Sequence, residues 1–78
     1  MKFSDLKVGM ILTKSQPDDT RAYKNVNEVQ VMALDDPYLD VMILSTTDNH
    51  SHLIGTIDSM RGSLQNFEIK TNDNYEIF

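Results

Sequence analysis

Hydrophobic residues alternate with other residues in two stretches near the middle of the chain. The alternating positions are Val29, Val31 and Ala33 in the first stretch and Leu39, Val41 and Ile43 in the second. A period of two is typical of β-strands, because successive side chains point to opposite faces of a sheet. The pattern therefore predicts strands over 29–34 and 39–44, joined by an acidic turn over 35–38 that contains Pro37.

Shorter apolar runs on either side predict further strands with turns between them. In chain order we expect a turn over 4–9, strands over 10–14, 29–34, 39–44, 53–57 and 67–70, and one helical or 3₁₀ turn within 59–66. The stretch 15–25 is polar and predicts a long loop, a kind of segment that often carries binding residues. The last residues, 75–78, are expected to form an edge strand or a loose tail.

The resulting order predicts an all-β fold in which 1–78 is a single domain: a small five-stranded antiparallel barrel or strongly bent sheet. The segment Asp-Leu-Lys-Val-Gly-Met over 5–10 is similar to the opening of small barrels in phage and prophage accessory proteins, and 64–69 is similar to their closing segment. The chain thus resembles an SH3-like small barrel of that kind. The resemblance implies a long loop after the first strand and a role as an accessory binding protein.

Composition removes several classes of function. The net charge of −5 argues against duplex DNA, which requires a basic face. The chain has no cysteine, which excludes disulfides and thiolate metal sites and fits a cytoplasmic location. No purely apolar run is longer than that at 41–44, which is far too short for a membrane span, so we expect no membrane association.

The two central strands are apolar on both faces, although one face of a small antiparallel sheet usually contacts water. The residues left on the outer face are predicted to be Met32, Leu34, Met42, Leu44 and Ile54. One interpretation is a subunit interface, which predicts a homo-oligomer, most simply a dimer. The other is that the N-terminal turn and Tyr75, Ile77 and Phe78 cover this face.

Two surfaces are candidates for binding. Arg21, Tyr23, Lys24 and Arg61 could hold a small nucleotide, with the tyrosine stacking on a base and the cations on phosphate. Asp35, Asp36 and Asp40 could instead meet a basic partner.

Catalytic chemistry has little support. His50 and His52 could chelate a metal with Asp48, but the same residues suit a solvated hairpin tip, and we expect no metal and no cofactor. The paired acids at 18–19 and 35–36 suit solvated turns better than an acid–base pair. We therefore expect no catalytic residue and no enzyme activity. The hypothesis from the sequence is a non-enzymatic binding module, a phage-type accessory protein that blocks a host protein or defence component. The alternative is an oligomeric sponge for a small nucleotide signal.

Overall fold

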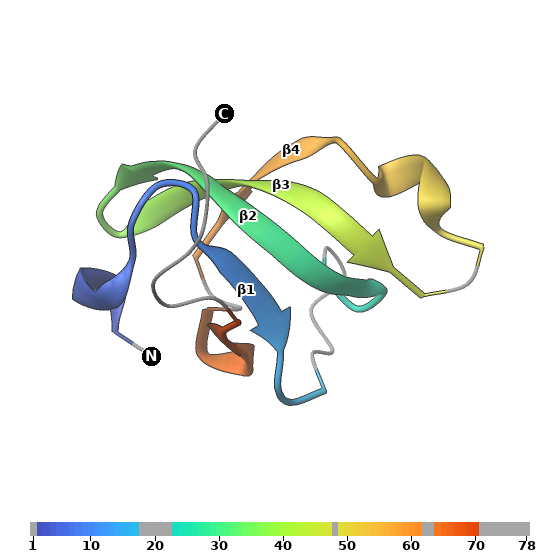
Figure 1. Cartoon of the computed structure of the whole chain (residues 1–78), viewed down its shortest axis with the longest axis horizontal. Helices are drawn as coiled ribbons and strands as arrows, with labels where there is room; N and C mark the ends of the chain where they lie inside the picture. Colours follow the sequence, from blue (N-terminus) through green and yellow to red (C-terminus); the bar gives the residue numbers. More distant parts are fainter. Residues whose placement is uncertain (1, 18–22, 48, 62–63, 71–78) are drawn as a thin grey trace.

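Five strands form one antiparallel sheet in the computed structural model, which describes residues 2–17, 23–47, 49–61 and 64–70 (Figure 1). The strands are β1 (Ile11–Lys14), β2 (Val26–Asp35), β3 (Tyr38–Thr46), β4 (Ile57–Met60) and β5 (Phe67–Ile69). Three 3₁₀ turns accompany them: η1 (Phe3–Asp5), η2 (Ser51–Leu53) and η3 (Leu64–Asn66). No helix in this described part of the chain has the length and apolar character needed to cross a membrane. The predicted all-β class, the antiparallel arrangement and the short helical turn before the last strand are confirmed.

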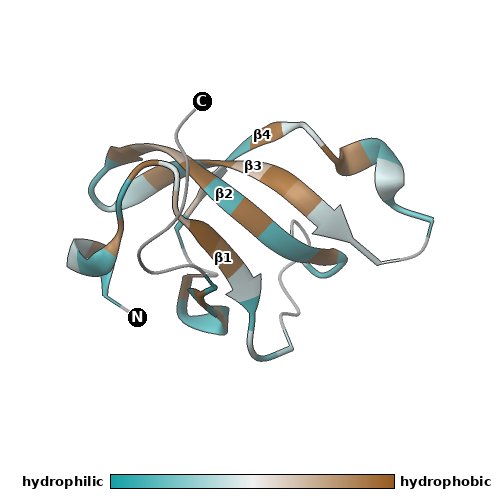
Figure 2. Ribbon diagram, in the orientation of Figure 1, coloured by the Kyte–Doolittle hydropathy of each residue, from teal (hydrophilic) through white to brown (hydrophobic). Residues whose placement is uncertain are grey.

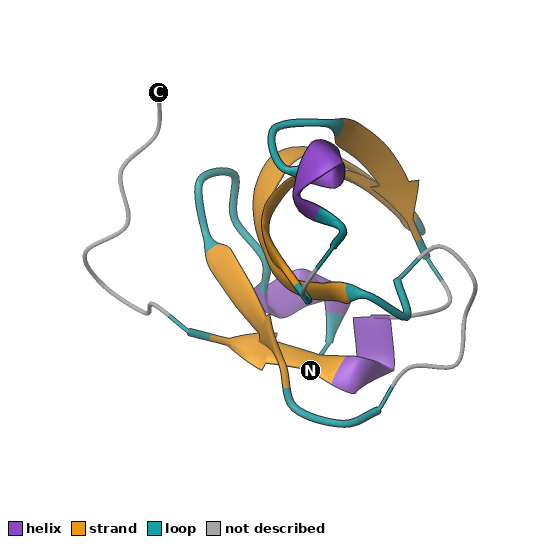
Figure 3. Ribbon diagram, turned by 90° about the vertical axis from the view of Figure 1, so that its right-hand side faces the viewer, coloured by secondary structure: helices purple, strands orange, loops and turns teal. Residues whose placement is uncertain are grey.

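The strands lie in the order β4-β3-β2-β1-β5, so β4 and β5 are the two edges of the sheet. Figure 3 shows the strands curving around a common interior. In the described residues the ladders join β1 to β2 and β5, and β3 to β2 and β4, and they do not close the sheet. The structure is therefore a strongly bent open sheet.

The core lies on the concave side of this sheet. It contains the buried side chains Leu6, Met10, Leu12, Tyr23, Val26, Val29, Val31, Leu39, Val41, Ile43, Met60 and Phe67. Figure 2 shows hydrophobic positions along β1, β2 and β3, and mostly hydrophilic ones in the connections. The alternation of 29–31 and 39–43 thus predicted correctly which residues face inward, as a period of two requires.

A register shift in β2 reverses which residues face inward near the hairpin. Val31 pairs with Val41, but the next pairs are Ala33 with Asp40 and Leu34 with Leu39. The extra residue in β2 is Met32, and such a bulge moves the following residues to opposite faces. Ala33 is exposed, whereas Leu34 packs against the core. The assignment of Leu34 to the outer face was therefore wrong.

The fourth strand begins later than predicted. Leu53 ends η2, and Gly55 has a φ of 89°, a left-handed conformation that glycine adopts without strain. Strand pairing with β3 then runs from Ile57 to Met60, and Met60 is completely buried opposite Leu39. The predicted last element at 75–78 lies outside the described residues.

Candidate functional site

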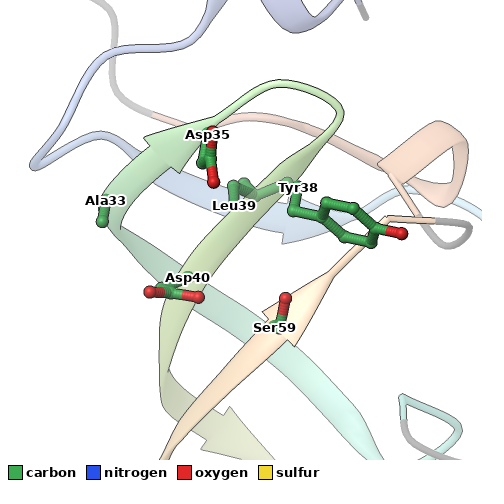
Figure 4. A pocket seen from close by; sticks show the side chains of 6 residues that line it. All are labelled: Ala33, Asp35, Tyr38, Leu39, Asp40 and Ser59. Atoms are coloured by element: carbon green, nitrogen blue, oxygen red, sulfur yellow. The ribbon is translucent and has the colours of Figure 1, made fainter.

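A hollow of about 240 Å³ lies beside the tip of the β2–β3 hairpin. Its lining comprises Ala33, Asp35, Tyr38, Leu39, Asp40 and Ser59 (Figure 4). Ladder pairing places Asp40 between Ala33 on β2 and Ser59 on β4, so the acid has a small side chain on each side. The next outward-facing pair along the hairpin is Asp35 with Tyr38. The hollow therefore exists because two small residues share a row with Asp40.

The charge of this hollow is negative. Asp35 and Asp40 line it, and Asp36 lies in the adjoining turn; all three are exposed. The salt bridge found in the described residues joins Lys70 to Glu28 at 2.7 Å, and it involves none of these aspartates. The predicted acidic surface is thus a group of carboxylates that no cation of the described residues pairs with.

Tyr38 adds an aromatic platform at the rim. Its side chain is 46% exposed, and the Arg61 guanidinium carbon lies 5.4 Å from the ring centroid. Arg61 Nη1 also donates a hydrogen bond to the Tyr38 hydroxyl at 3.4 Å. This is a cation–π arrangement, in which the negative face of the ring attracts a cation. The sequence analysis treated Tyr38 only as a turn residue, and no local pattern distinguished it.

The predicted nucleotide cluster is not assembled as expected. Tyr23 is only 3% exposed, and its ring packs edge-on against Phe67 at 6.3 Å between centroids. It therefore cannot stack on a base without leaving the core, and its assignment as a stacking residue was wrong. Lys24 is exposed, Arg61 contacts Tyr38, and Arg21 lies outside the described residues.

A second, shallower hollow of about 500 Å³ lies at the start of the long loop. It is lined by Thr13, Lys14, Ser15, Gln16, Pro17 and Asn27. The Lys14 ammonium donates hydrogen bonds to the carbonyls of Tyr23 at 2.6 Å and Lys24 at 3.1 Å. This cation therefore holds the far end of the loop, and the hollow is a weaker candidate for a ligand site than the acidic one.

The two histidines lie near each other on the connection between β3 and β4. Their ring centroids are 6.2 Å apart, and His50 Nδ1 is 3.4 Å from the Thr47 hydroxyl. Within the described residues no group of three or more histidine, cysteine, aspartate or glutamate side chains could hold a metal ion. Asp48, the third ligand considered, lies outside them.

The outer face carries partly exposed apolar side chains. Met32, Met42 and Leu44 are partly buried, Ile54 is 49% exposed, and Ile57 is 54% exposed. Ile57 pairs with Met42, so the two side chains lie side by side on this face. The predicted interface residues all keep some exposure, and Leu34 differs from the others because it packs against the core. Ile57 was not among the residues predicted for this face.

No protein-family model, curated protein or solved structure matches this chain.

Proposed function

We propose that the protein is a non-enzymatic binding module, and that its acidic hollow receives a basic side chain of a partner protein. The observation that carries this proposal is the row Ser59, Asp40 and Ala33, in which an exposed carboxylate lies between two small side chains that leave space beside it. Asp35 and Tyr38 stand beside it at the rim. Together they offer charge and an aromatic surface to one cation.

The size of the hollow supports a side chain as its occupant. Small-molecule sites usually measure about 300–1,000 Å³, and this hollow encloses about 240 Å³. The contact of Arg61 with Tyr38 is a further argument, since it is an example in this molecule of a guanidinium resting on that ring. An arginine from a partner could approach the same rim in the same chemical manner.

A nucleotide sponge has weaker support. It requires an exposed ring and converging cations, but Tyr23 is buried and Arg61 is engaged with Tyr38. A net charge of −5 also repels phosphate at long range. Both facts favour a basic protein surface over a nucleotide as the binding partner.

The resemblance to SH3-like accessory barrels supports two finer parts of the proposal. One is that the strongly bent sheet has an SH3-like fold, for which the position of β1 between β2 and β5 is an argument. The other is that the partner is a host protein, encountered in the cytoplasm.

Reversal of charge in the hollow tests the binding proposal. We expect Asp40→Lys and Asp35→Lys each to weaken binding of a fluorescent arginine-rich peptide about tenfold, because each replaces an attraction by a repulsion. Fluorescence anisotropy titrations at low and physiological salt would measure this, and wild-type affinity should fall with salt. Thermal unfolding of each variant would verify that it is folded.

Glu68→Lys is the matched control. Glu68 is exposed on β5, and its replacement changes the net charge by the same amount. If it weakens peptide binding as much as Asp40→Lys does, the peptide responds only to overall charge and the proposal is wrong. Wild-type protein that does not bind the peptide at all would also overturn it.

We also propose that two copies of the chain associate through the outer face. The paired side chains of Met42 and Ile57 are the support, because apolar groups at this position gain by leaving water. Met42→Asp should lower the mass measured by light scattering to that of a monomer and leave the circular dichroism spectrum unchanged. Gln65→Asp, which adds a charge at an exposed position in η3, should leave the mass unchanged. A wild-type protein that is monomeric at high micromolar concentration would exclude this interface.

A further inference from the structure

Strand β4 is an edge of the sheet, and its far side has no strand partner among the described residues. Such an edge normally presents free backbone donors and acceptors, which can pair with a strand of another chain. Four residues, Ile57 to Met60, form this edge. Their hydrogen bonds decide whether it is open to pairing.

Ser59 is the residue whose backbone turns away from β3. Its N–H donates to the Asp58 carboxylate at 2.8 Å, and its carbonyl accepts a hydrogen bond from the Tyr23 hydroxyl at 3.3 Å. In an antiparallel pair, residues bonded to the neighbouring strand alternate with residues that face away. Ile57 therefore also faces the free edge. We call the two bonds to the backbone of Ser59 the Ser59 cap.

The tyrosine of this cap is firmly held. Its ring is 3% exposed and packs against Phe67, the first residue of the opposite edge strand β5. Its carbonyl accepts the bond from Lys14 at 2.6 Å. The hydroxyl therefore reaches β4 from a side chain fixed at β5 and at the end of the long loop. A strand approaching β4 would have to displace an anchored group.

The carboxylate of the cap opposes pairing in a second way. Two copies of β4 that meet antiparallel around a two-fold axis bring their Asp58 side chains close together, because the strand has only four residues. Like charges facing each other across a strand pair are destabilising. Charged residues on edge strands are a common protection against association of this kind.

We propose that the Ser59 cap keeps β4 closed to strand addition by a second copy of this chain, and that loss of the cap converts β4 into a self-pairing surface. The inference does not depend on the acidic hollow. It is also separate from association through the outer face, which would use side chains and leave the backbone of Ile57 unpaired.

Hydrogen exchange of single amides by NMR distinguishes these modes of association. In the parent protein the Ile57 amide should exchange fast at every protein concentration. In the double variant Tyr23→Phe with Asp58→Ala, we expect its exchange to slow about tenfold or more as concentration rises, since a paired strand would bind this N–H. The amide of Val29, in a central ladder, reports global unfolding in both proteins.

Two outcomes would overturn the proposal. One is a folded double variant in which Ile57 exchange does not change with concentration. The other is an Ile57 amide that is already protected in the parent in a concentration-dependent manner, because the edge would then be open with the cap in place. If the double variant does not fold, the single variant Asp58→Ala takes its place in the same exchange measurement. It retains the Tyr23 ring and should show the same slowing to a smaller extent, and no slowing would refute the role of the cap.

Discussion

Replacing Tyr23 with alanine should lower the free energy of unfolding by about 3–5 kcal/mol, whereas Tyr23→Phe should lower it by only about 1 kcal/mol. The alanine variant loses a ring that is 3% exposed and packs against Phe67. The phenylalanine variant keeps the ring and loses only the hydrogen bond to the Ser59 carbonyl. For a domain of this size, the larger loss is a substantial fraction of total stability.

Urea unfolding followed by circular dichroism would measure both variants, with the midpoint and the slope fitted together. Tyr38→Ala is the matched control, because this tyrosine is 46% exposed and its removal should cost much less. If Tyr23→Ala and Tyr38→Ala are equally stable, Tyr23 is not a core residue. It would then again be a candidate for stacking on a ligand.

The neighbouring residues Ala33 and Leu34 should respond in opposite ways to the same charge. Leu34→Asp should cost about 3 kcal/mol, because it removes apolar packing and brings a carboxylate against the core. Ala33→Asp should change stability by no more than about 0.5 kcal/mol, since Ala33 is exposed on the outer face. The cause of the difference is the register shift between Val31 and Ala33.

Thermal unfolding of the two variants provides the measurement. Without the bulge, strict alternation from Val31 would place Ala33 inward and Leu34 outward, and the order of the two stabilities would reverse. The two variants together therefore test the register of β2 against β3. An equal loss of stability in both variants would show that the side chains of Ala33 and Leu34 do not differ in burial, which would contradict the register shift.

The bulge also shows where the sequence alone is ambiguous. Residues 31–34 are all apolar, so alternation cannot indicate at which position the strand gains an extra residue. Between Leu39 and Ile43 the non-core positions include Asp40, and there the inward face was predicted correctly. The start of β4 was predicted wrongly for a related reason. Leu53 and Ile57 have the spacing of residues on one face of a strand, with Gly55 between them, although the strand begins only at Ile57.

The candidate site could be predicted only in part. Asp35, Asp36 and Asp40 are close in sequence to a turn, so their common location followed from the hairpin. The hollow depends on Ser59 being in register with Asp40, which is a pairing between distant segments that no local pattern encodes. Tyr23 was misassigned because an aromatic residue in a polar loop suggests exposure. Its actual partners, Phe67 and Ser59, lie on the two edge strands.

The anchoring of the long loop at both ends has a consequence for how the chain can vary. On one side, the backbone amides of Ser15 and Gln16 donate to the Asn66 carbonyl at 2.9 and 3.3 Å. On the other side, Tyr23 is fixed by the core and by Lys14. Both ends of the loop are therefore fixed to the folded sheet. Lengthening such a loop twofold costs only about 0.6 kcal/mol in closure entropy. Insertions between these anchors therefore cost little in closure entropy, so loop length is a property that this fold leaves open to variation.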